Sequence, residues 1–157
     1  LQAAPRWRTP VIIICGRDDL RDTALPPGVT VLREVAREVY LDHLRRCRLV
    51  ALPLLPTERA TGQVVMLEAM ALGKPVVTSR TPGTVDLLQD EVTGLLVQPG
   101  DADALAQAVQ RVLDDPALAR RLSNAALAFV KAEGSTDLHA RRKLEAITSL
   151  WQPIRPG

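Results

Sequence analysis

The apolar residues of this chain gather in short unbroken runs, and several segments between these runs have helical spacing. The run Val-Ile-Ile-Ile-Cys at 11–15 is made mostly of β-branched residues without alternation. Such a run predicts a strand that is buried on both faces, as in a parallel sheet covered by helices. The predicted strands occupy residues 11–15, 29–32, 49–52, 75–78 and 93–97.

Helical patterns fill the intervals between these strands. Tyr40, Leu44 and Cys47 recur at i, i+4 and i+7, which predicts a helix with one apolar face and one basic face. Asp101 stands at a favoured capping position and Pro116 at a favoured first position, so both predict helix starts. The predicted helices occupy residues 37–46, 62–72, a short segment that ends near 89, 102–113, 116–131 and 136–150.

This alternation of strands and helices predicts the fold class. Strands that alternate with helices are typical of an α/β fold, here a Rossmann-like, doubly wound parallel sheet with helices on both faces. The C-terminal helices follow the last strand. At 157 residues the chain is long enough for a single domain that buries a core without a disulfide or a metal.

Composition excludes several classes of function. A formal charge of +2 with dispersed basic residues argues against nucleic-acid binding. The few aromatic residues (Tyr40, Phe129, Trp7 and Trp151) argue against a base-stacking surface. The two cysteines fall in no metal or redox spacing, and no apolar run approaches the ~20 residues of a membrane span. We therefore expect a cytoplasmic protein without a metal or a cofactor.

One carboxylate, Glu68, lies in the middle of the otherwise apolar helix predicted at 62–72. Removing a charge from water costs on the order of several kcal/mol unless a partner binds it. Glu68 is therefore either a ligand-binding residue or an acid paired with an arginine in the core. The second interpretation is purely structural.

Three glycine-containing segments follow predicted strands or precede predicted helices. In an open parallel sheet these positions lie at the carboxyl edge, where helix N-termini present free amides to anions. Glu68 lies ~8 Å along its helix from Gln63, about the distance from a diphosphate to a ribose. A carboxylate can accept two hydrogen bonds from a vicinal diol. The predicted diphosphate-binding residues are Gly16 and Arg17, then Thr61, Gly62 and Gln63, then Thr81 and Gly83.

At this point the sequence resembles a known family. Glu-Ala-Met-Ala-Leu-Gly-Lys-Pro-Val-Val at 68–77, Thr-Pro-Gly at 81–83, Thr-Gly-Leu-Leu-Val at 93–97 and Pro-Gly-Asp at 99–101 carry the resemblance. They resemble the C-terminal, donor-binding half of GT-B retaining glycosyltransferases of the GT4-like group, over about residues 11–130. The resemblance implies a sugar transferase that uses a nucleotide-diphosphate sugar and no metal.

The same resemblance assigns roles to individual residues. It implies that Glu68 binds the ribose, that Gly62 and Gln63 lie beside the phosphates and the sugar, and that the backbone near Val35 contacts the base. Gly16 and Arg17 match the glycine-centred turn after the family's second strand in this domain.

Two positions depart from the family pattern. The family commonly has a glutamate, eight positions before the ribose-binding one, that contacts the donor sugar, and here that position is Ala60. Glu58, two residues away, is the candidate substitute. The acid that follows the family's next strand is the shorter Asp86.

The resemblance also implies that parts of the enzyme lie outside this chain. Such domains begin with a central strand followed by an arginine and a lysine, and they pair with an N-terminal acceptor-binding domain. Residues 1–5 resemble the last turn of a helix. We therefore expect a fragment that is inactive alone, with a gap between its first and third strands. A strand from a second chain or a swapped segment fills that gap, or the sheet rearranges.

Other functions stay open at this point. A non-catalytic relative that binds a nucleotide or a partner is compatible with Ala60, and a nucleotide-sugar epimerase of the same fold is compatible with the whole pattern. A homodimer and a peripheral membrane association of the full-length enzyme are further expectations. Gly73-Lys74 is not a P-loop, because Glu68 stands at the glycine position of that motif and Pro75 replaces its serine or threonine.

Overall fold

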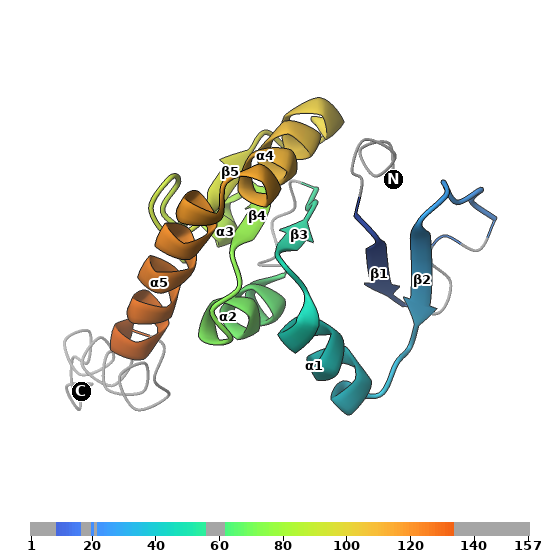
Figure 1. The fold of residues 1–157 in the computed structure, drawn as a ribbon, viewed down its shortest axis with the longest axis horizontal. Helices are drawn as coiled ribbons and strands as arrows, with labels where there is room; N and C mark the ends of the chain where they lie inside the picture. The colour runs from blue at the N-terminus through green and yellow to red at the C-terminus, as the bar shows by residue number, and fades with distance from the viewer. Residues whose placement is uncertain (1–8, 17–19, 21, 56–61, 134–157) are drawn as a thin grey trace, which may run out of the picture.

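The computed structural model describes residues 9–16, 20, 22–55 and 62–133 (Figure 1). Strands and helices alternate along most of this length, as predicted. Their order is β1 (Val11–Cys15), β2 (Val29–Arg33), α1 (Arg37–Arg46), β3 (Val50–Leu52), α2 (Gln63–Ala71), β4 (Val76–Ser79), α3 (Pro82–Val85), β5 (Leu95–Val97), α4 (Ala102–Asp114) and α5 (Pro116–Glu133). The predicted helix end at 1–5 and the helix at 136–150 lie outside the described residues.

The described strands form two parallel sheets. β1 pairs with β2 from Val11 opposite Val29 to Cys15 opposite Arg33. β4 pairs with β3 on one side and with β5 on the other. Among the described strands, β1 and β3 do not pair, so the sheet is interrupted between them (Figure 1). This interruption lies where the family resemblance predicted a gap.

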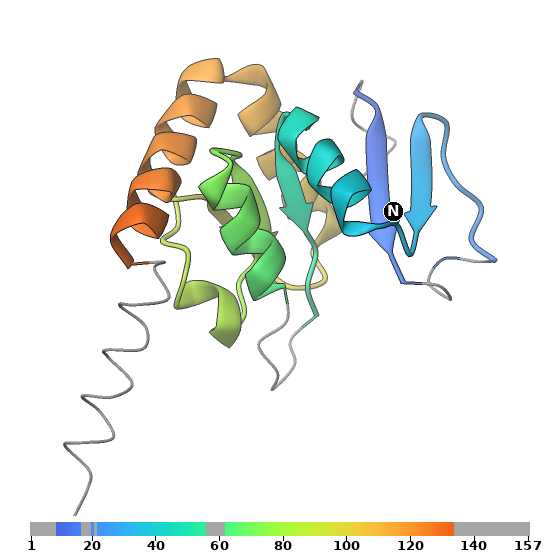
Figure 2. The ribbon, with the colours of Figure 1, turned by 90° about the horizontal axis from the view of Figure 1, so that it is seen from below.

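Helices cover both faces of the three-stranded sheet. Val76 and Val77 are consecutive in β4 and point to opposite faces. Val76 belongs to a buried cluster with Met66 and Met70 of α2 and Leu44 of α1. Val77 belongs to a second cluster, in which α4 contributes several buried side chains. α1 and α2 therefore lie on one face and α4 on the other (Figure 2).

The last helix, α5, joins the two layers. Its Leu122 packs in the cluster of α4, and its Ala126 packs in the cluster of α2. Both helices after β5 start as predicted, because Asp101 Oδ1 accepts the Ala104 N–H at 2.8 Å and Asp115 Oδ1 accepts the Ala117 N–H at 2.9 Å. In the part of the chain that the structure describes, no helix has the length and apolarity that a membrane span needs.

Two predictions about the chain after β4 were wrong in extent. The short helix ends at Val85 rather than near 89, because the Leu87 N–H donates to the Thr84 carbonyl at 3.2 Å in a tighter turn, after which Leu88 packs in the core. The strand predicted from residue 93 begins at Leu95, since the Thr93 hydroxyl binds the Gln89 N–H at 2.8 Å and closes a turn.

The predicted burial of β1 on both faces was also wrong. Ile12 is 47% exposed, and the other β1 residues are half-buried. The physical reason is that no side chain of β1 belongs to either of the buried clusters that the described helices form, so its faces stay in contact with water.

Candidate functional site

Helix α2 begins at a glycine that its geometry requires. Gly62 has φ 76° and ψ −5°, in the left-handed region that favours glycine. A Cβ at this position would lie 2.9 Å from Leu54 Cδ1. The first intrahelical bond runs from the Met66 N–H to the Gly62 carbonyl at 3.0 Å. The preceding amides have no acceptor within the helix, so the start of α2 can bind an anion.

Gln63 connects the start of α2 to the turn after β4. Its Nε2 donates to the Gly83 carbonyl at 3.1 Å. Two of the three predicted anion-binding segments, those at Gly62 and at Gly83, therefore come together. Both lie at the carboxyl edge of the three-stranded sheet, as predicted.

Buried hydroxyl groups hold this edge in shape. Ser79 Oγ accepts the Leu54 N–H at 2.9 Å and so joins the ends of β3 and β4. Thr84 is fully buried, and its hydroxyl donates to the Ser79 carbonyl at 2.7 Å and accepts the Thr81 N–H at 2.8 Å. The Thr81 hydroxyl lies 3.2 Å from that of Thr84. In this structure Thr81 therefore builds the turn, and its binding of a phosphate stays a prediction.

The third predicted segment belongs to the other sheet. Gly16 is exposed at the end of β1. Half-buried Val35 lies in the link between β2 and α1. The Glu34 N–H donates to the Cys15 carbonyl at 3.1 Å, which fixes where that link leaves the sheet. Asp86 is exposed just after α3. Predicted positions Arg17, Glu58, Ala60 and Thr61 lie outside the described residues.

Glu68 is held by two side chains of α1. Arg37 Nη2 donates to Glu68 Oε1 at 2.6 Å, and the Tyr40 hydroxyl donates to Oε2 at 2.7 Å. The Glu68 side chain is 19% exposed and that of Arg37 is 64% exposed. The structural interpretation of Glu68, an acid paired with an arginine, is therefore confirmed as a contact. A carboxylate has about four acceptor positions, so these two hydrogen bonds leave Glu68 able to accept others.

These contacts shift the pKa values of the partners. Partial burial raises the pKa of Glu68, but the hydrogen bonds from Tyr40 and Arg37 outweigh it, so this pKa lies below its ordinary value. Burial, followed by the hydrogen bond to Glu68, raises the pKa of Tyr40. Glu68 is therefore ionised at neutral pH and accepts hydrogen bonds only.

The sequence did not identify Tyr40 and Arg37 as partners of Glu68. Tyr40 was assigned to the apolar face of its helix, and it does contact the core cluster around Leu44. The available signal was the i, i+3 spacing of Arg37 and Tyr40, which places them on one side of α1. Gly73-Lys74 was rejected as a P-loop, and in the structure Lys74 Nζ donates to the Cys47 carbonyl at 3.0 Å.

Comparison with known proteins identifies the family. The profile of Glycosyl transferases group 1 matches residues 1–115. This chain belongs to that family. A glycogen synthase of Mycobacterium tuberculosis is 39% identical over 93 residues, which are 55% of this chain and 22% of the relative.

Solved structures of glycosyltransferases have the same fold. Sucrose-phosphate synthase from Thermosynechococcus elongatus superposes with a TM-score of 0.78 at 27% identity, over 95% of this chain and 40% of the other. Anabaena HepE, solved with UDP-glucose, superposes with a TM-score of 0.76 at 22% identity, over 95% of this chain and 44% of the other. The predicted fold class is confirmed, and the chain spans less than half the length of these relatives.

Proposed function

We propose that this chain is the nucleotide-sugar-binding half of a retaining, GT4-like glycosyltransferase that transfers a sugar from a nucleotide-diphosphate sugar to an acceptor. One arrangement carries the proposal: an ionised Glu68 lies midway along α2, and Gln63 ties the start of the same helix to Gly83. Family membership and the UDP-glucose complex of the related fold support it.

The geometry suits the two ends of such a donor. The diphosphate lies at the amides and the positive end of α2, and the ribose lies deeper, with its diol on Glu68. During transfer the bond from the anomeric carbon to the diphosphate oxygen breaks, and its electron pair leaves with the nucleoside diphosphate. The oxygen of the acceptor hydroxyl bonds to that carbon, and its proton passes to the departing diphosphate. Fixed amides stabilise the negative charge that develops on the leaving group.

We also propose that a parallel strand occupies the interruption between β1 and β3. The apolar sequence of β1, which pairs only with β2 among the described strands, supports this, because unbroken apolar runs are typical of strands inside a covered parallel sheet. The strand comes from a segment of the same polypeptide beyond these residues or from a second copy. Light scattering of the complete gene product distinguishes the two sources, since a monomer excludes the second copy.

The experiment that tests the function uses the complete gene product with a panel of UDP-, ADP- and GDP-sugars. We expect release of the nucleoside diphosphate from at least one donor, with or without an acceptor. Glu68→Gln keeps the shape of the side chain but removes its charge, so we expect at least a tenfold lower kcat/KM. Glu91→Gln, which breaks the ion pair with Arg111 away from the site, is the matched control. Equal rates for the two variants would contradict the proposal.

A second candidate is a non-catalytic relative, favoured by Ala60 at the position of the usual donor-sugar glutamate. In that case the gene product binds a nucleoside diphosphate in a Glu68-dependent manner but releases none from any donor. Under either candidate we propose a cytoplasmic full-length protein, with peripheral membrane association where its acceptor is a lipid.

A further inference from the structure

We infer that Tyr40 and Arg37 are positioning residues, which hold Glu68 so that one acceptor position on each of its oxygens faces a vicinal diol of the nucleotide. This inference rests on the proposed function and adds two residues of α1 to the site. Neither residue was singled out for nucleotide binding by the sequence.

The two donors divide the carboxylate between them. Arg37 occupies Oε1 and Tyr40 occupies Oε2, at 2.6 and 2.7 Å. A carboxylate has about two acceptor positions on each oxygen. With one position filled on each, one is left on each. A diol has two hydroxyl groups on adjacent carbons, so it matches a carboxylate that offers one acceptor on either oxygen.

Helix α1 is fixed well enough to position Glu68. Leu44, one turn after Tyr40, is 6% exposed and packs in the cluster of Met66 and Met70. At the other end of α1, Lys74 Nζ donates to the carbonyls of Arg45 at 2.5 Å and Cys47 at 3.0 Å. α1 is therefore attached to the α2 layer at its start, middle and end. The hydroxyl of Tyr40 gains a defined position from this packing.

Two donors also remove the rotational freedom of Glu68. A glutamate side chain that is free to rotate loses conformational entropy when it is ordered. Tyr40 and Arg37 order it before the nucleotide arrives. Preordering of this kind strengthens binding without any new contact to the ligand.

The test measures nucleotide binding by the complete gene product with isothermal titration calorimetry. The probes are UDP, ADP and GDP and their 2′-deoxy forms, which lack one hydroxyl of the diol. We expect the wild-type protein to prefer one ribonucleotide over its deoxy form. Tyr40→Phe keeps the packed ring and removes only the hydroxyl. We expect it to bind that ribonucleotide about tenfold more weakly, as for loss of one hydrogen bond to a charged group, and to lose most of the preference.

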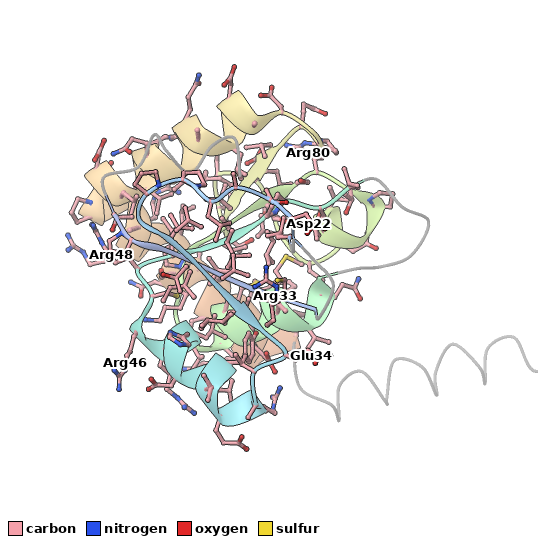
Figure 3. The ribbon with its side chains drawn as sticks, turned by 90° about the vertical axis from the view of Figure 1, so that its right-hand side faces the viewer. Asp22, Arg33, Glu34, Arg46, Arg48 and Arg80 are labelled. Atoms are coloured by element: carbon pink, nitrogen blue, oxygen red, sulfur yellow. The ribbon has the colours of Figure 1, made fainter. Side chains whose placement is uncertain are left out.

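Arg37→Gln is the second variant, because its exposed side chain can be changed with little effect on packing. We expect a smaller loss in the same direction. Asp42→Asn is the matched control, since it breaks an exposed ion pair with Arg46 on the same helix (labelled in Figure 3) and leaves Glu68 untouched. We expect it to bind both forms of the nucleotide as the wild type does.

The outcomes separate this inference from the proposed function. If the wild-type protein binds none of the probes, or if Glu68→Gln keeps the preference for the ribonucleotide, the proposed function fails. If Glu68→Gln loses that preference while Tyr40→Phe and Arg37→Gln keep it, only the positioning inference fails. Tighter binding by Tyr40→Phe would also overturn the inference, because it would show that Tyr40 competes with the nucleotide.

Discussion

Strands β1 and β4 are both short, rich in β-branched residues and parallel to their neighbours, yet they differ sharply in burial. Val76 and Val77 of β4 are each 0% exposed, whereas Ile12 of β1 is 47% exposed. β4 has a strand on each side and a helical layer on each face, while β1 pairs only with β2 among the described strands. An apolar run therefore determines that a strand forms, and its neighbours determine how much apolar surface it removes from water.

Helix α1 connects these two regions, because it follows β2 in the chain and packs against α2. Its Arg37 and Tyr40 bind Glu68, so the geometry of the candidate site depends on the position of α1 after the two-stranded sheet. The three-stranded sheet supplies the carboxyl edge of the site, which its buried hydroxyl groups hold in shape. The two-stranded sheet leads into the start of α1, the helix that orients Glu68.

We expect the largest effect on stability for a change in the buried core beside the three-stranded sheet. Leu122→Ala removes a fully buried side chain from the cluster of α4 and α5 and should lower the free energy of unfolding by about 2–5 kcal/mol. Urea denaturation measures this loss. Leu55→Ala is the matched control, since Leu55 is 71% exposed and should cost less than about 0.5 kcal/mol. Equal losses would remove the distinction between buried and exposed positions.

A smaller effect is expected at the close contact between β4 and the turn before β5. A Cβ on Gly94 would lie 2.7 Å from the Val76 carbonyl oxygen and 2.5 Å from Leu88 Cδ1. Gly94→Ala should therefore push the backbone of β4 and cost about 1–3 kcal/mol. Thermal unfolding measures it, and an unchanged midpoint would show that this region is less tightly packed than its burial indicates.

Ile12→Ala in β1 tests whether the exposed strand becomes buried in the complete protein. In the 157-residue chain alone we expect a loss of about 1 kcal/mol or less, because Ile12 keeps nearly half of its surface in water. In the complete gene product, a strand in the interruption, together with the segments that cover that face of the sheet, would bury Ile12, and the loss should rise to about 2–5 kcal/mol. Denaturant titration of both proteins measures the difference. The same small loss in both would count against a strand at this place.

The smallest effect is the pH dependence of the Glu68 contact. The folded pKa of Glu68 lies below its ordinary value near 4.5, so the contact stabilises the fold fully above that value. The stabilisation is lost as the pH falls through the lower, folded pKa. The melting temperatures of the wild-type protein and Glu68→Gln should therefore differ at pH 7 and converge toward pH 3. A constant difference between these pH values would show that ionised Glu68 adds nothing to stability.

The sequence alone determined the elements and the fold class. The bounds of β1 and α1 were predicted to the residue, and the starts of α4 and α5 followed from Asp101 and Pro116. These features depend on local periodicity and capping, which neighbouring residues express without the rest of the fold. The family signature around Glu68 also lies within one contiguous stretch, so it was readable before the structure was known.

Which side chains contact each other depends on the tertiary structure. Tyr40 and Arg37 lie 28 and 31 residues before Glu68, and Gln63 lies 20 residues before Gly83. No local pattern encodes such pairs, because they depend on how α1 packs against α2 and on the turn that follows β4. The partial exposure of β1 could not be predicted from the sequence either, because burial depends on neighbours in space and an apolar run specifies none of them.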